Sequence, residues 1–289
     1  MDAAEQKSLV AVPLVVLLGA GLALAGSQGG VTLGGVPVFA LVVAAAFVVQ
    51  WLVFIPSFLT GTERFFDLTA SLTYTGLTLI TLLVVGSWDL RRVLLAAVVL
   101  IWALRLGTFL FARVNRAGAD DRFDEIKKSL PRFLTVWTVQ GLWVSVTASA
   151  AWIAISSSTQ VGLDAFAVIG VLIWAAGFAI EVIADRQKSE FRADPANRGR
   201  FISTGLWSRS RHPNYFGEIV LWIGVAVIAF PALQGWQLVG LISPIFVTLL
   251  LTRVSGVPLL EAKADAKWGD QADYQEYRRT TPVLVPKLR

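Results

Sequence analysis

Long apolar segments alternate with short polar ones along almost the whole chain. A helix needs about 20 apolar residues to cross the hydrocarbon core of a bilayer, which is about 30 Å thick. Some of the apolar runs are shorter than that or carry charge at their ends, so the pattern predicts a bundle of seven to eight transmembrane helices. The expected spans are residues 9–25, 36–58, 68–86, 93–111, 133–155, 165–184, 215–230 and 236–253.

Polar positions are concentrated in the later part of the chain. Residues 185–214 form the longest polar stretch, with turn signals at Asp194-Pro195 and at Gly199 and Gly205. Residues 261–277 have the pattern of an amphipathic cytoplasmic helix. The fold class is therefore all-α integral membrane. We expect a single transmembrane domain over residues 1–289, with cytoplasmic loops and a C-terminal amphipathic helix.

Composition supports a membrane class and narrows the chemistry. The chain is 55% hydrophobic and 16% charged, whereas soluble domains are about 25% charged. The first apolar run is interpreted as a membrane helix, because Asp2, Glu5 and Lys7 do not make the positive start of a secretory signal. With no cysteine and one histidine, disulfides, cysteine ligands and a multi-histidine metal site are excluded, although carboxylates can still hold a hard cation. We expect no metal.

The basic residues indicate the topology. If the N-terminus is cytoplasmic and there are eight spans, only Arg91 and Arg92 lie on the opposite side, and Arg105 lies within a span. The other Lys and Arg residues fall in cytoplasmic segments, which is the distribution that membrane insertion favours. The net charge of +5 follows from this rule and from the anionic inner leaflet, so nucleic-acid binding is a poor interpretation. We expect both termini to be cytoplasmic.

Two acids close the apolar run before the long polar stretch. Glu181 and Asp185 are four residues apart and so share one helix face, and Arg192 shares it if the helix continues. Such carboxylates can accept hydrogen bonds from a ribose or an amide. The alternative is that Glu181 pairs with Arg105 or another arginine to satisfy a buried charge.

The only histidine lies in a polar cluster at residues 208–218. Pro213 suits the first turn of a helix, on which Asn214 and Glu218 share a face with Tyr215 beside it. The free amides of that turn, flanked by Arg209 and Arg211, are a plausible phosphate site. The alternative is a basic helix start that contacts lipid headgroups. This explains the arginines but not the pair formed by Asn214 and Glu218.

Several segments together resemble the steroid 5α-reductase superfamily, and more narrowly its uncharacterised bacterial membrane branch. The specific segments are Asp185-Arg186-Gln187-Lys188, Asn197-Arg198-Gly199-Arg200-Phe201, Gly205-Leu206-Trp207 and Arg211-His212-Pro213-Asn214-Tyr215-Phe216-Gly217-Glu218. Weaker matches occur at residues 62–67, 105–107 and 121–123. The resemblance implies a bacterial inner (plasma) membrane protein.

The resemblance also implies a cofactor and its site. Reductases of the superfamily bind NADPH between the C-terminal helices and the cytoplasmic loops, which here is the part 181–289. By motif, Asn214 would contact the nicotinamide amide, with Glu218 supporting it. The remaining cofactor-binding residues implied are Glu181, Asp185, Arg192, Arg211, His212 and Arg253. Glu261 and Tyr277 match an acid and a tyrosine in the tail of the sterol reductases.

Two departures from the pattern affect the expected chemistry. Steroid 5α-reductases have an asparagine where this chain has Glu181, and a tyrosine that contacts the substrate carbonyl where this chain has Trp102. An indole N–H donates a hydrogen bond but supplies no proton, which argues against a 3-oxo-Δ4-steroid substrate but not against hydride transfer. The expected catalytic residues are Tyr215, Glu218, Tyr277 and Glu261, with Tyr215 or Tyr277 as the phenol that delivers the proton.

The sequence thus predicts an NADPH-dependent oxidoreductase acting on CH–CH groups, similar to the 3-oxo-5α-steroid 4-dehydrogenases. Its substrate would be a steroid-like lipid or another lipid enone or enoyl compound, met in the bilayer. One alternative is an S-adenosylmethionine-dependent methyltransferase, because isoprenylcysteine methyltransferases of the same superfamily also carry Arg-His-Pro-x-Tyr. The other is a non-enzymatic lipid-binding membrane protein.

Overall fold

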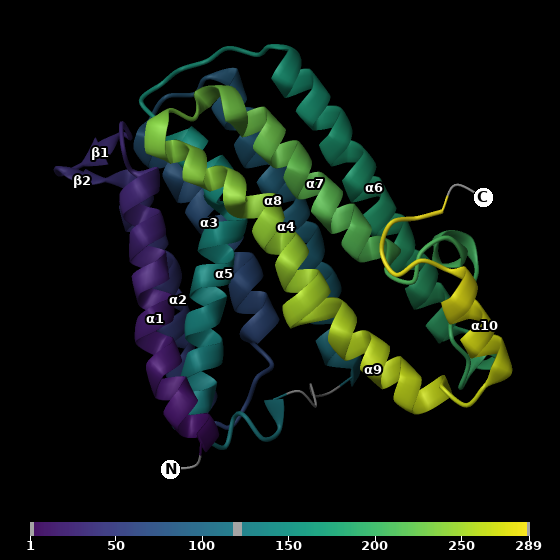
Figure 1. Ribbon diagram of the computed structural model, residues 1–289. Coiled ribbons are helices and arrows are strands. Elements are labelled where there is room, and N and C mark those ends of the chain that lie inside the picture. The colour runs from purple at the N-terminus through teal and green to yellow at the C-terminus, as the bar shows by residue number, and fades with distance from the viewer. Residues whose placement is uncertain (1–2, 118–122, 288–289) are drawn as a thin grey trace. The chain divides into compact units, whose positions relative to one another are not determined.

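The computed structural model describes residues 3–117 and 123–287, and helices make up most of it (Figure 1). Eight helical segments in this part of the chain are long and apolar enough to cross a membrane. The all-α membrane fold predicted from the apolar runs is therefore confirmed, with eight spans. The chain divides into two compact units, Met1–Ala167 with Ile228–Ser243, and Val168–Val227 with Pro244–Arg289.

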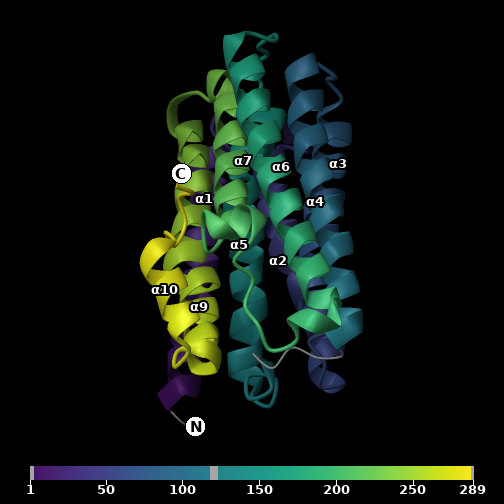
Figure 2. The same ribbon diagram turned by 90° about the vertical axis from the view of Figure 1, so that its right-hand side faces the viewer.

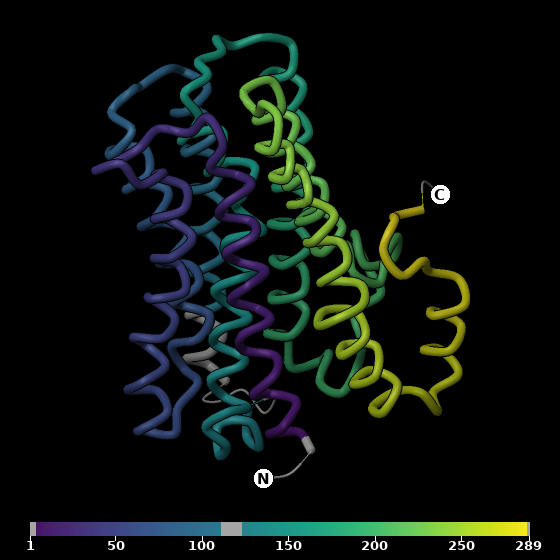
Figure 3. The backbone as a smooth tube through the Cα atoms, turned by 60° about the vertical axis from the view of Figure 1, so that its left-hand side comes forward, coloured from purple at the N-terminus to yellow at the C-terminus, as the bar shows by residue number. Residues whose placement is uncertain are grey.

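The first unit is built around one central helix. The segment α5 contacts α1, α2, α3 and α4, and its membrane-spanning window is 83% buried. A short antiparallel hairpin, β1 paired with β2, connects α1 to α2 (Figure 3). The elements of this unit are α1 (Ala3–Gly26), β1 (Thr32–Leu33), β2 (Val36–Pro37), α2 (Val38–Leu59), α3 (Phe66–Val85), α4 (Leu90–Ala117) and α5 (Leu130–Ser156), with 3₁₀ turns at Phe230–Ala232 and Gly235–Leu241.

Buried arginines hold one end of this unit together. Arg91, which is 1% exposed, forms an ion pair with Asp164 at 2.6 Å and donates to the backbone oxygens of Gly162 and Ile228. Hydrogen bonding to Arg91 lowers the pKa of Asp164. A buried charge is tolerated only when its donors are satisfied in this way. Arg92 is likewise buried and pairs with Asp89 at 3.0 Å, so both arginines are structural.

The second unit contains the two helices that flank the sequence motifs. In Figures 1 and 2, α6 and α7 lie side by side. Gly177 and Gly217 allow close contact, because a Cβ at Gly217 would lie 2.6 Å from the backbone oxygen of Gly177. Membrane helices use small residues for such contacts. The elements are α6 (Ala165–Ala193), 3₁₀ turns at Pro195–Asn197 and Gly205–Ser208, α7 (Pro213–Ala229), α8 (Ile242–Leu249), a π-helical turn at Leu250–Val254, α9 (Gly256–Trp268) and α10 (Ala272–Thr280).

Two parts of this unit extend or correct the sequence-based expectation. Helix α6 continues to Ala193, beyond the expected end of the membrane span at residue 184, so Glu181, Asp185 and Arg192 lie on one helix, which is the case that the sequence left open. The amphipathic tail is two helices, α9 and α10. It breaks at Gly269, where the backbone N–H of Gln271 turns back to the oxygen of Trp268 at 2.9 Å. Glycine has low helix propensity, which explains the position of the break.

Candidate functional site

The histidine motif begins a helix, as the position of Pro213 predicts. Helix α7 starts at Pro213, so the segment Arg209–His212 leads into its free N-terminus. Upstream of it, Trp207 is buried, and its indole N–H donates to the backbone oxygen of Ala184 on α6 at 3.0 Å. The motif is thereby fixed to α6 on one side before the helix begins.

The chain after α10 holds the same segment from another side. The backbone N–H of Arg211 donates to the oxygen of Pro282 at 2.9 Å. The hydroxyl of Ser210 donates to the oxygen of Leu284 at 2.7 Å. Because these bonds engage residues directly before His212, the tail sets the position of the motif. The sequence pattern gave no signal for this contact.

Glu261 of α9 joins the two polar residues of the motif. Its carboxylate lies 2.7 Å from Nε2 of His212 and 3.1 Å from a guanidinium nitrogen of Arg211. The imidazole is 5% exposed and stacks on Tyr215, with the ring planes 9° apart. Burial lowers the pKa of His212 and outweighs the opposing effect of Glu261. His212 is therefore a neutral ring at pH 7 that donates from Nε2 to the carboxylate.

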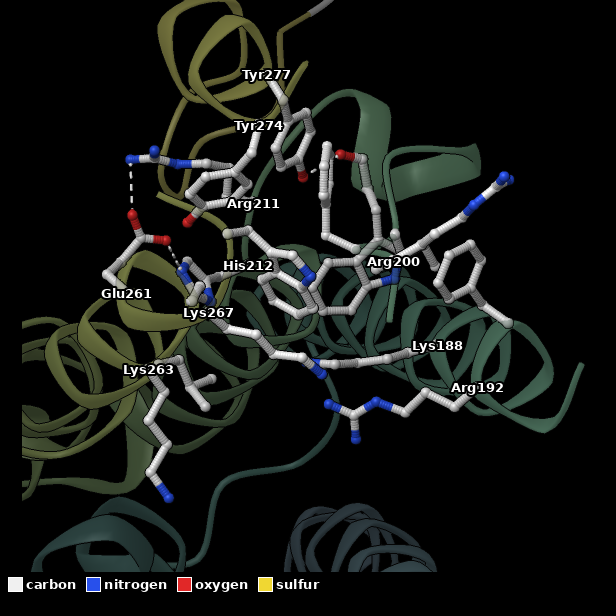
Figure 4. A pocket seen from close by; sticks show the side chains of 17 residues that line it. Lys188, Arg192, Arg200, Arg211, His212, Glu261, Lys263, Lys267, Tyr274 and Tyr277 are labelled. Atoms are coloured by element: carbon white, nitrogen blue, oxygen red, sulfur yellow. Dashed lines mark hydrogen bonds and ion pairs between the residues drawn. The ribbon is translucent and has the colours of Figure 1, made fainter. Parts of the chain in front are cut away.

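A cavity of about 300 Å³ lies beside this cluster, entirely within the second unit. Figure 4 shows Glu261 bridging Arg211 and His212 at its edge. Glu261 is the one acid among the described residues that line the cavity, whereas six lining residues are basic: Lys188, Arg192, Arg200, Arg211, Lys263 and Lys267. Such an excess of positive charge in a concave surface favours an anionic ligand.

Aromatic rings form much of the remaining wall, at Phe191, Phe201, Trp207, Trp268, Tyr274 and Tyr277. The hydroxyl of Tyr277 donates to the backbone oxygen of Trp207 at 2.7 Å. Burial raises the pKa of Tyr277, and it raises the pKa of Tyr274 to about 12. Both phenols are therefore protonated at neutral pH.

The structure groups the residues expected from the motifs into two sets. Those that line the cavity are Arg192, Arg211, His212, Glu261 and Tyr277. The others lie on or near the membrane helices of the same unit and do not line it, namely Glu181, Asp185, Asn214, Tyr215, Glu218 and Arg253. Arg200, Lys263, Lys267 and Trp268 line the cavity but were not among the expected residues. The sequence did contain one indication for the lysines: Lys263 and Lys267 are four residues apart and so share one face of the tail helix.

The α6 acids and the start of α7 are close to each other. Glu181 and Asp185 are buried, at 3% and 6% exposure. A Cβ at Gly217 would lie 2.6 Å from the backbone nitrogen of Glu181, so this turn of α6 packs against the turn of α7 that carries Glu218. The amide oxygen of Asn214 is buried and has no hydrogen-bond partner among the described residues. It is a candidate acceptor for an amide group of a ligand.

Trp102, which the resemblance aligns with a tyrosine of the steroid 5α-reductases, lies in the first unit. Its indole is 2% exposed and packs edge to face with Tyr74 of α3, with ring centroids 5.1 Å apart. Arg105 lies over the ring of Phe109, at 5.3 Å from its centroid. A phenol is thus present next to Trp102, although it comes from a different helix.

Comparison with known proteins identifies the family of the chain. A family described as protein of unknown function (DUF1295) matches residues 53–281. The chain belongs to this family. No solved structure matches the chain significantly.

Curated relatives place this DUF1295 chain near known reductases. It is 27% identical to 3-oxo-5-alpha-steroid 4-dehydrogenase 1 of Rattus norvegicus over 118 residues, which are 40% of each protein. It is 28% identical to steroid 5-alpha-reductase DET2 of Arabidopsis thaliana over 121 residues, 41% of this chain and 40% of the relative. It is 32% identical to Delta(14)-sterol reductase ERG24 of Saccharomyces cerevisiae over 142 residues, 45% of this chain and 30% of the relative.

The chain therefore spans well under two thirds of the length of these relatives. The matches confirm the resemblance to the steroid 5α-reductase superfamily that the C-terminal motifs indicated.

Proposed function

We propose that the protein is a membrane reductase that uses NADPH to reduce a C=C bond in a steroid-like lipid or another lipid enone or enoyl compound. The observation that carries this proposal is the cavity of the second unit, in which six basic residues surround one acid. It lies next to the motif that the chain has in common with reductases.

The charge of the cavity fits the phosphates of NADPH. The dinucleotide carries a pyrophosphate and a 2′-phosphate, and charge-assisted hydrogen bonds to arginine and lysine are the usual way to bind such groups. Ligand pockets measure about 300–1,000 Å³, so a cavity of about 300 Å³ suits the adenosine-phosphate half. The flat aromatic wall suits the base.

The reactive half of the cofactor would be held by α7. Asn214 has a buried amide oxygen without a hydrogen-bond partner in the described part of the chain, which fits the amide of a nicotinamide. Glu218 is one turn further along α7 and supports this contact. Glu181 and Asp185 of α6 would hold hydroxyl groups of the cofactor. When bound, NADPH supplies the hydride, while the chain orients the reactants and delivers a proton.

The four expected catalytic residues have different roles in this proposal. Glu261 accepts hydrogen bonds from both Arg211 and His212, so it acts as an ionised holding group. Tyr277 donates a hydrogen bond to the backbone oxygen of Trp207, and this bond stabilises the cavity wall. We assign proton delivery to Tyr215 and Glu218, because both lie in the first turns of α7 beside Asn214, where the reactive half of the cofactor would be held.

The positive charge of the cavity also distinguishes NADPH from S-adenosylmethionine, the cofactor of the main alternative function. S-adenosylmethionine has no phosphate and carries a positive sulfonium, so six basic residues around it would repel it. The expected result is that NADPH raises the melting temperature of the detergent-solubilised protein, whereas S-adenosylmethionine does not. A rise with S-adenosylmethionine alone would replace the reductase proposal with a methyltransferase. No rise with either would favour a lipid-binding protein.

A matched pair of arginines on α6 tests the site itself. Arg192 lines the cavity, whereas Arg186 pairs with Glu190 at 2.7 Å and does not line it. Arg192→Ala should weaken NADPH binding by about 1.5–3 kcal/mol, the range for hydrogen bonds to charged groups. Arg186→Ala should leave the affinity unchanged. Equal effects of the two substitutions in a titration would contradict the placement of NADPH in this cavity.

A further inference from the structure

One side of the cavity is built from α9 and the loop before Gly205, and it has positive charge without a protein counter-ion. Neither Arg200 nor Lys267 forms an ion pair with a carboxylate in the part of the chain that the structure describes. By contrast, Arg211 is already paired with Glu261 at 3.1 Å. A cation without a partner in a concave site is stabilised by a bound anion.

The same side contains an aromatic platform that is held in place. The indole N–H of Trp268 donates to the backbone oxygen of Gly199 at 2.6 Å, which ties α9 to the loop that carries Arg200. The ring of Phe201 packs edge to face with Trp268, with centroids 6.0 Å apart. The ammonium of Lys267 lies over the Trp268 ring, 4.8 Å from its centroid. A fixed flat ring beside the Lys267 ammonium, on the side of the cavity that Arg200 also lines, matches a planar base that carries a phosphate close by.

We propose that this side of the cavity binds the adenosine 2′-phosphate of NADPH, with the phosphate on Lys267 and Arg200 and the adenine on Trp268. The inference rests on the proposed function and names the part of the cavity that distinguishes NADPH from NADH. Arg253, which is among the cofactor-binding residues that the resemblance implies, lies in the π-helical turn and does not line the cavity. Lysine suits a phosphate monoester as a point charge with three donors.

The test measures the affinities of the solubilised protein for NADPH and for NADH in parallel titrations. Lys267→Gln and Arg200→Gln should each weaken NADPH binding tenfold or more and change NADH binding less than twofold. Arg253→Gln is the matched control, and it should leave the ratio of the two affinities unchanged. If Arg253→Gln lowers the ratio while the other two variants do not, the assignment is overturned. If the parent protein binds neither dinucleotide, the proposed function itself fails.

Two further experiments test the adenine contact and whether the bound phosphate belongs to a nucleotide or to a lipid headgroup. Trp268→Phe should retain NADPH affinity within threefold, whereas Trp268→Ala should lose tenfold, because only the first keeps a flat ring. Adenosine 2′,5′-bisphosphate should compete with NADPH, and a soluble short-chain phosphatidic acid should not. Competition by the phosphatidic acid as strong as that by the nucleotide would assign this side to a lipid headgroup and overturn the inference.

Discussion

At the scale of single residues, His212 shows how burial sets the state of a side chain. The ring is nearly covered and has one carboxylate partner, Glu261, at 2.7 Å. The positive charges of Lys188 and Arg211 act in the same direction as burial, and together they lower the pKa of His212 below its usual 6.5. The neutral ring is therefore part of the folded state.

This state predicts a pH dependence of stability. A histidine with a lowered folded pKa binds its proton more readily in the unfolded chain. Its contribution to stability is therefore complete above pH of about 6.5 and is lost as the pH falls through the folded pKa. The melting temperature of the solubilised protein should decrease over this range. His212→Gln keeps a donor for Glu261 but does not titrate, so its decrease should be smaller. Parallel curves for the two proteins would contradict the assignment.

Asn214 and Glu218 provide a second prediction at this scale. They share a face of α7, and neither is an apolar packing residue of the span. Asn214→Ala or Glu218→Gln should leave a folded protein whose NADPH oxidation is reduced tenfold or more, about 1.4 kcal/mol in the barrier. The assay uses a panel of α,β-unsaturated lipids and steroids.

The control for this pair is Glu190→Gln, which alters an exposed acid of α6 paired with Arg186. It should retain full turnover. Full turnover in Asn214→Ala and Glu218→Gln as well would show that the motif is not catalytic. If those two variants fail to insert or fold, the pair stabilises the bundle instead.

At the scale of elements, the contact between α6 and α7 positions the acids of one helix against the motif of the other. The contact depends on glycine, because a Cβ at Gly217 would lie 2.6 Å from two backbone atoms of α6. Backbone atoms cannot move aside as a flexible side chain can. The distance between the helices, and with it the position of Glu181 relative to Glu218, is therefore set by residues without side chains.

Gly217→Ala should consequently lower the free energy of unfolding by about 1–3 kcal/mol, the usual cost of overpacking. Gly21→Ala is the matched control, because Gly21 lies inside α1 and a Cβ there meets no atom within 4 Å. That change should be neutral or stabilising by about 0.5–1 kcal/mol, since alanine favours helix. Equal melting temperatures for the two variants would show that α6 and α7 do not pack as described.

The elements also show which features the sequence could reveal. The spans follow from apolar runs, and the start of α7 follows from Pro213, because both depend on local chemistry. The sequence left open whether α6 continues past residue 184, because charged residues continue a helix as readily as they form a loop. The side of the cavity formed by Arg200, Lys267 and Trp268 depends on a contact between residues 69 positions apart. The periodicity of hydrophobic and polar residues does not reveal a contact between segments so far apart in the sequence.

At the scale of the whole molecule, charge distribution is the main guide to orientation in the membrane. If all eight apolar helices cross the membrane, both ends of the chain lie on one side. Most basic residues fall in segments that would be cytoplasmic in this arrangement, including those of the cavity. An NADPH site has to face the cytoplasm to meet its cofactor, so the proposed function and the charge rule require the same orientation.

The natural absence of cysteine allows this orientation to be tested directly. Cysteine introduced at Ser189 near the end of α6, or at the exposed Ser203 in the loop that follows, should react with a membrane-impermeant thiol reagent only after the inner side is made accessible. Cysteine at Ser158, which is exposed between α5 and α6, should react from outside intact cells. Labelling of Ser189→Cys or Ser203→Cys from outside intact cells would reverse the topology. The cavity would then face away from the cellular pool of NADPH, and the proposed reductase function would fail with it.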